Sequence, residues 1–138
     1  MTTPYDLPPE DSGPSGWATG GLVFAGAALV LAGIFQAFSG IAAIADDQFF
    51  VKTQHYAFEI DVTAWGWIHL IIGILVFVVG LGLFSRAGWA AVGAIAVAML
   101  SAVSNFFFIP DYPVWSVLII ALDVWVIWAL TRPGLVRD

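Results

Sequence analysis

Four long uncharged intervals constrain the fold of this chain more than any other feature. Residues 12–45, 62–85 and 87–110 contain no charged side chain, and residues 112–131 contain only Asp123. A helix needs about 20 mainly apolar residues to cross the hydrocarbon core of a bilayer. Helices are expected because a lone spanning segment must satisfy its own backbone polar groups. The sequence therefore predicts an all-α integral membrane protein with four transmembrane helices.

The composition agrees with this class and excludes several others. Hydrophobic residues make up 61% of the chain and charged residues 10%, whereas a soluble domain has roughly a quarter charged residues. No basic patch indicates nucleic-acid binding. The chain has no cysteine, which excludes disulfides, thiolate metal sites and thiol catalysis. The partners expected are therefore the lipid bilayer and other membrane protein chains, with no nucleic acid.

The domain organisation follows from the uncharged intervals. The helices are expected at about residues 17–44, 63–84, 88–109 and 112–131. Their last two connections are so short that sequential helices must be antiparallel neighbours, which predicts an antiparallel bundle. Residues 1–16 are rich in Pro, Gly, Ser and acids and are predicted to be a disordered tail. Residues 132–138 are predicted to form a second tail.

The few cations predict the orientation. Arg86, Arg132 and Arg137 fall on the side of the two termini, and only Lys52 falls on the other side. Cytoplasmic loops hold the excess of Lys and Arg. We therefore expect a multi-pass plasma-membrane protein with both termini in the cytoplasm.

The one sizeable loop, residues 45–62, is expected outside the cell. Two short runs rich in aromatic and β-branched residues flank Gln54-His55, which predicts a short extracellular β-hairpin. The alternative is an amphipathic helix lying on the membrane surface. The apolar side chains of this loop and of the helix after it are expected to form an interaction surface. Its members are Phe49, Phe50, Tyr56, Phe58, Ile60, Trp65 and Trp67.

Small residues indicate how the helices pack. The second helix has Gly66, Gly73 and Gly80 seven residues apart, and the third has alanines four apart at positions 90, 94, 98 and 102. Small residues let membrane helices approach closely. We expect the first three helices to approach one another closely, with the bulky fourth helix at the edge or in an oligomer interface.

The polar residues within the spans form the candidate functional cluster. They are Gln36, His69, Asn105 and Asp123, accompanied by Ser101, Ser104 and Ser116. At a rise of about 1.5 Å per residue, Gln36, His69 and Asn105 share one layer of the outer leaflet and Asp123 lies near the midplane. A carboxylate there costs roughly 2.5–3.5 kcal/mol, so Asp123 is expected to be a neutral acid. Its role is either a hydrogen bond to another helix or protomer, or the binding of a proton or ion.

His69 is expected to be structural, donating to Asn105, Gln36 or a backbone carbonyl. The alternative is a haem ligand shared between two protomers. One histidine without a nearby carboxylate does not make a metal site. No nucleophile–base pair, phosphate loop or dinucleotide motif appears. The sequence thus predicts no catalytic residue, no metal and no cofactor.

Two motifs resemble a known family. They are Trp65-Gly66-Trp67-Ile68-His69-Leu70 and Tyr112-Pro113-Val114-Trp115-Ser116. Together with Ile119–Thr131 they resemble the small four-helix membrane proteins of actinobacteria that are catalogued as a domain of unknown function. The resemblance covers about residues 17–131 and implies a fold but no activity. In that family an Asp-Gly turn usually stands where this chain has Gln54-His55, which favours the hairpin although this sequence departs from the pattern there.

These observations lead to one functional hypothesis and two alternatives. We expect a non-enzymatic membrane protein that acts as an oligomeric scaffold or as an accessory subunit of a membrane complex. The first alternative is an oligomeric transporter, channel or proton-handling protein that uses Asp123 and His69. The second is a redox accessory subunit associated with haem or a quinone near His69.

Overall fold

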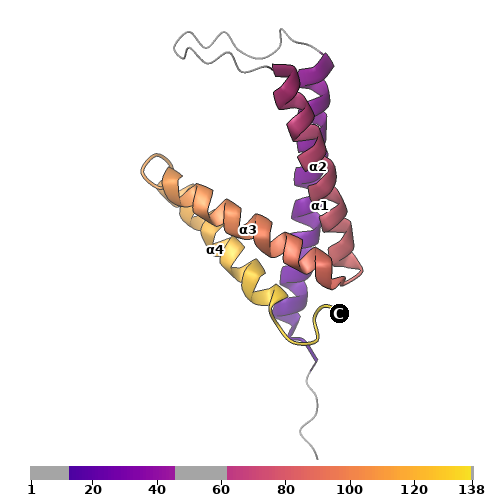
Figure 1. The fold of residues 1–138 in the computed structure, drawn as a ribbon. Helices are drawn as coiled ribbons and strands as arrows, with labels where there is room; N and C mark the ends of the chain where they lie inside the picture. Colours follow the sequence, from indigo (N-terminus) through magenta and orange to yellow (C-terminus); the bar gives the residue numbers. More distant parts are fainter. Residues whose placement is uncertain (1–12, 46–61, 138) are drawn as a thin grey trace, which may run out of the picture.

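Four helices account for most of the described chain. The computed structural model describes residues 13–45 and 62–137 (Figure 1). The helices are α1 (Gly16–Ala45), α2 (Val62–Phe84), α3 (Gly88–Phe108) and α4 (Pro113–Leu130). Each is long and apolar enough to cross a membrane, which confirms the prediction of an all-helical membrane protein. The predicted hairpin and most of the predicted N-terminal tail lie outside the described residues.

Local sequence explains where these helices begin. Ser15 stands just before α1, and its Oγ accepts a hydrogen bond from the Ala18 N–H at 3.3 Å, as an N-cap residue does. The α2–α3 turn places Arg86 at a positive φ of 57°. Pro113 opens α4, where its missing N–H costs no helical hydrogen bond.

Helices α1 and α2 form a hairpin whose backbones touch. A Cβ atom at Gly33 would lie 2.6 Å from the Phe77 nitrogen, and one at Gly73 would lie 2.5 Å from the Ala37 nitrogen. A Cβ atom at Gly40 would lie 2.6 Å from the carbonyl oxygen of Gly66. No side chain fits at such distances, so these positions require glycine. The predicted glycine stripe of α2 is therefore a helix contact, and its partner is α1.

Helices α3 and α4 form the second hairpin. Ala90, Ala94 and Ala98 of α3 are at most 5% exposed, in the same buried cluster as Val126 and Leu130 of α4. The small face of α3 thus receives the bulky face of α4. The prediction that the third helix packs closely with the first two is wrong, because α3 packs mainly on α4. The fourth helix, predicted at the edge or in an oligomer interface, also touches α1.

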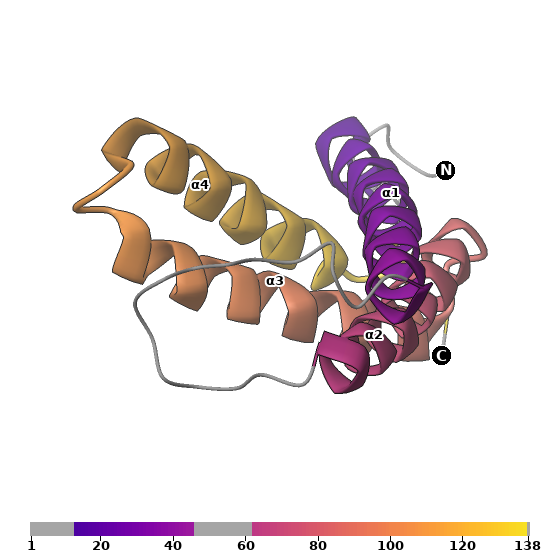
Figure 2. The same ribbon diagram turned by 90° about the horizontal axis from the view of Figure 1, so that it is seen from above.

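The two hairpins meet at one end and diverge toward the other (Figure 1). We call the meeting point the joined end; it holds the start of α1, the α2–α3 turn and the C-terminus. Pairs of small residues make its closest contacts: Gly21 lies against Ala129, and Gly82 lies against Ala90. The view from above shows the same divergence (Figure 2). The structure is therefore a V of two antiparallel hairpins, where the sequence predicted one bundle.

Exposed apolar residues continue the helix faces that join the two hairpins. Val79 contacts Gly93, and Trp125 contacts Phe24 with ring centroids 5.7 Å apart. Residues seven positions away lie on the same helix face, two turns from these contacts. These residues are Leu31, Ile72, Leu100 and Leu118, and each is at least 41% exposed. The four side chains define what we call the V walls.

The last residues of the chain close the joined end. Gly134, with a φ of 77°, turns the chain back, and Leu135 is completely buried in the core cluster. The Arg137 N–H donates to the carbonyl oxygen of Arg86 at 2.6 Å. Residues 131–137 thus form a packed strap between α4 and the α2–α3 turn, where the sequence predicted a tail.

The backbone contact of α1 with α2 yields a stability prediction. Gly33→Ala should lower the free energy of unfolding by about 1–3 kcal/mol, because the added methyl group forces the two helices apart. Gly20→Ala is the matched control, since its Cβ would lie 4.0 Å from the nearest side-chain atom, in Trp125. Its effect should stay within about 0.5 kcal/mol. Tryptophan fluorescence during denaturation in detergent measures the free energy of unfolding of both variants. Equal losses in the Gly33 and Gly20 variants would contradict the close backbone contact.

Candidate functional site

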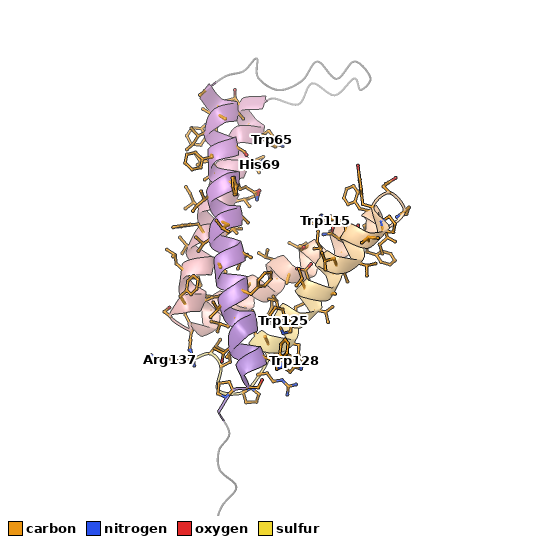
Figure 3. The ribbon with its side chains drawn as sticks, turned by 180° about the vertical axis from the view of Figure 1, so that it is seen from behind. Trp65, His69, Trp115, Trp125, Trp128 and Arg137 are labelled. Carbon is orange, nitrogen blue, oxygen red and sulfur yellow. The ribbon has the colours of Figure 1, made fainter. Side chains whose placement is uncertain are left out.

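Trp65 and His69 form an aromatic pair near the start of α2. Their rings are stacked, with centroids 3.6 Å apart and planes inclined by 27°. Nδ1 of His69 lies 3.0 Å from the Trp65 carbonyl oxygen, one turn earlier in the helix. An N–H on Nδ1 donates to this carbonyl, because a carbonyl oxygen can only accept. The pair therefore fixes the orientation of the imidazole within its own helix (Figure 3).

Gln36 belongs to the same hairpin as His69. Gly40 faces Gly66 and Gly33 faces Gly73 across the contact, so Gln36 and His69 lie at similar depths. Each stands three residues after a glycine of that contact, beside the seam of the two helices. Both side chains are half-buried. The structure thus brings these two predicted residues to one hairpin, while Asn105 and Asp123 belong to the other.

On the second hairpin, polar groups meet between α3 and α4. Asn105 donates from Nδ2 to the Ser101 carbonyl oxygen at 2.9 Å, which satisfies its amide within its own helix. The Ser101 side chain is the hydrogen-bond partner of the Asp123 carboxyl group. Asp123 is therefore bonded to the neighbouring helix of the same chain. The layer that the sequence predicted for Gln36, His69 and Asn105 is divided between the two arms of the V.

Two oxygen atoms of this region have no hydrogen-bond partner among the described residues. They are Oγ of Ser116, a residue only 1% exposed, and Oδ2 of Asp123. The two residues are seven apart and therefore lie on one face of α4, about 10 Å from each other. With Ser101 and Asn105 of α3 they make up what we call the polar seam. A buried polar group without a partner costs about 1–3 kcal/mol, so the seam has hydrogen-bonding capacity to spare.

Only two members of the predicted interaction surface, Trp65 and Trp67, belong to the described residues. Trp67 is 53% exposed, whereas Trp65 is half-buried against His69. The remaining members, residues 49, 50, 56, 58 and 60, lie outside the described residues. Within residues 13–45 and 62–137, no three His, Asp or Glu side chains lie close enough to hold a metal ion. The described arrangement offers hydrogen bonds and apolar contact surfaces.

Sequence reasoning undervalued several residues that the structure brings together. Ser101 lies three residues after Ala98, on the buried alanine face, and that spacing was its available signal. Ser116 lies seven residues before Asp123, which placed the two on one face. Trp128 and Arg132 are four residues apart, so the arginine stacks over the indole with its guanidinium carbon 4.2 Å from the ring centroid.

Comparison with known families now identifies the chain. A family model described as "Domain of unknown function (DUF7144)" matches residues 21–134. The chain belongs to this family. The matched region begins in the second turn of α1 and ends in the strap, so it contains the polar seam and the V walls. No curated protein and no solved structure matches the chain.

The bond between Ser101 and Asp123 can be tested directly. Ser101→Ala should lower the free energy of unfolding by about 1 kcal/mol, because it leaves the Asp123 carboxyl group unpaired inside the hairpin. Ser104→Ala provides the control, since Ser104 is exposed on the same helix. Denaturation in detergent, followed by tryptophan fluorescence, compares the two. A Ser104 variant as unstable as the Ser101 variant would argue against a special role for this bond.

Proposed function

We propose that this DUF7144 protein acts by association within the membrane, as an oligomeric scaffold or an accessory subunit of a membrane complex, and not as an enzyme. The observation behind this proposal is the V. Within residues 13–45 and 62–137, the two hairpins meet at the joined end and diverge beyond it (Figure 1), and the V walls there are exposed. A transmembrane helix placed there would touch both hairpins at once.

The physics of the bilayer explains why such a site favours a protein. Lipid tails are as apolar as leucine, so helices associate through shape and a few hydrogen bonds. The V walls offer shape, and His69, one turn from Ile72 on α2, adds a polar group beside them. A second copy filling the V makes a scaffold, and a different chain filling it makes this protein an accessory subunit.

The orientation belongs to the same proposal. Arg86, Arg132 and Arg137 all lie at the joined end, which holds the α2–α3 turn and the C-terminal strap. Because cytoplasmic segments hold the excess of cations, we place this end in the cytoplasm of a plasma-membrane protein. Residues 46–61 then lie outside, where their apolar side chains would extend the contact surface.

Cross-linking in native membranes tests the proposed contact. The chain has no cysteine, so any cross-link through a thiol must come from the single introduced cysteine. Leu118→Cys places the thiol on a V wall, and the control Val117→Cys turns it about 100° around α4. The two parent residues are 50% and 56% exposed. We expect a discrete cross-linked product from position 118 with a photoactivatable maleimide, and native mass spectrometry should show the same assembly uncross-linked. Equal products from both positions, or a monomer throughout, would refute association through the V.

A second candidate function, proton or ion handling, is favoured by the polar seam. Ser116 and Asp123 have unpartnered oxygens within the membrane-spanning part of α4, and water or a transported proton would satisfy them. Intramembrane acids often belong to proton relays. The seam lies inside one hairpin, so this function does not need the V to close.

Flux measurements separate this candidate from simple packing. Asp123→Asn keeps the hydrogen bond from Ser101 but cannot release a proton, so proton uptake by proteoliposomes should fall to the level of empty vesicles. Asp111→Asn in the exposed α3–α4 turn controls for loss of one acid. Unchanged uptake by the Asp123 variant would remove Asp123 from any such mechanism.

A further inference from the structure

A pocket lies at the joined end, between the start of α1 and the end of α4. Its walls are Gly13, Pro14 and Ser15 on one side and Trp128, Arg132 and Pro133 on the other, and its volume is about 490 Å³. Trp17 and Trp128 stand at this end, and tryptophans concentrate where a membrane meets water. The pocket is therefore at the level of lipid headgroups. Unlike the two apolar hollows among the helices, it has a charged side chain in its wall.

That side chain, Arg132, is held in place from both sides. Its guanidinium carbon lies 4.2 Å from the centroid of the Trp128 ring, and its backbone N–H donates to the Ala129 carbonyl oxygen at 3.2 Å. Three residues later, Leu135 is fully buried and anchors the strap. Arg132 is exposed and makes no ion pair within the described residues. A fixed guanidinium of this kind matches the paired oxygens of a phosphate group.

The helix ends on the two sides of the pocket act in opposite directions. The start of α1 favours an anion, because its first N–H groups and the helix dipole are positive there. The end of α4 favours a cation, and Arg132 already supplies one. The Thr131 hydroxyl donates to the Trp128 carbonyl oxygen at 2.9 Å, which satisfies one of the last acceptors of α4. The pocket is thus left with a net preference for an anion.

A second, apolar hollow lies next to this pocket along α1 and α4, on the side of the helix interiors. It is lined by Gly16, Trp17, Gly20 and Trp125 and measures about 320 Å³. Trp125 of the hollow precedes Trp128 of the pocket by one turn of α4, and both side chains lie near the lower part of α1 (Figure 3). The rings of Trp17 and Trp125 meet edge to face with centroids 6.4 Å apart. A polar pocket beside an apolar hollow suits the two parts of an amphiphile.

We infer that the α1–α4 edge binds an anionic phospholipid, with its phosphate on Arg132 and a hydrocarbon chain in the hollow beside Gly20 and Trp125. The apolar hollow favours a lipid over a soluble phosphate, which would fill only the outer pocket. Arg86 and Arg137 belong to the same end but do not line either hollow, because their backbones join at the α2–α3 turn. The site is therefore one specific edge and not the whole basic end.

Native mass spectrometry of the full, delipidated chain in detergent tests this inference. The probes are phosphatidylglycerol, phosphatidylcholine with the same acyl chains, and soluble glycerol phosphate. We expect one phosphatidylglycerol to be retained in preference to phosphatidylcholine, and no competition from glycerol phosphate. Arg132→Gln should weaken this binding about tenfold, as expected for loss of a charged hydrogen bond.

Matched variants identify the edge. Arg137→Gln removes the same charge from the same end and should change binding less than twofold. Gly20→Leu should displace the lipid by filling the hollow, whereas Gly20→Ala should not, since its methyl group fits beside Trp125. Circular dichroism confirms that each variant keeps its helices.

Three results would overturn the inference. Equal losses in the Arg132 and Arg137 variants would show diffuse attraction to a basic end. Equal retention of phosphatidylcholine would remove the requirement for a net anionic headgroup. Full competition by glycerol phosphate would make the ligand a soluble phosphate instead of a lipid.

Discussion

The direct contact of the α1 and α2 backbones is the interaction on which the rest of the structure depends. In lipid there is no hydrophobic force to hold apolar helices together, so stability comes from dispersion between atoms at close range. Gly33 and Gly73 bring two backbones to distances that no side chain would allow. The resulting hairpin fixes the start of α1 and the end of α2. Those two ends carry the close contacts of Gly21 with Ala129 and of Gly82 with Ala90.

The size of side chains along this scaffold explains its shape. Where the hairpins meet, glycine and alanine face each other, as at Gly21 with Ala129 and Gly82 with Ala90. Beyond the joined end, the faces that carry Phe24, Val79, Gly93 and Trp125 continue with the exposed residues Leu31, Ile72, Leu100 and Leu118. Large side chains on opposing walls keep helices apart unless their shapes interlock. The opening of the V therefore coincides with exposed leucine and isoleucine side chains beyond the joined end.

The sequence predicts some levels of this organisation better than others. The transmembrane spans can be predicted because a helix needs about 20 mainly apolar residues to cross the bilayer. The α2 glycine stripe can be predicted as a helix contact because its seven-residue spacing has few other causes. The neighbours of α3 cannot be predicted in this way, because a face of alanines could pack against either α2 or α4. Depth alone grouped His69 with Asn105, yet each bonds a carbonyl of its own helix, and they stand on different hairpins. The strap could not be predicted, because a single buried leucine in a short segment produces no periodic pattern.

The unequal lengths of the helices have a consequence for the surrounding bilayer. At about 1.5 Å per residue, the 30 residues of α1 measure about 45 Å and the 18 residues of α4 about 27 Å. The hydrocarbon layer is about 30 Å thick. The long helix must therefore tilt or extend beyond this layer, while the short one has to stand almost upright, each mismatch costing a fraction of a kcal/mol per Å. The angle between the hairpins is thereby coupled to bilayer thickness, so a thinner membrane favours a wider V and a thicker membrane a narrower one.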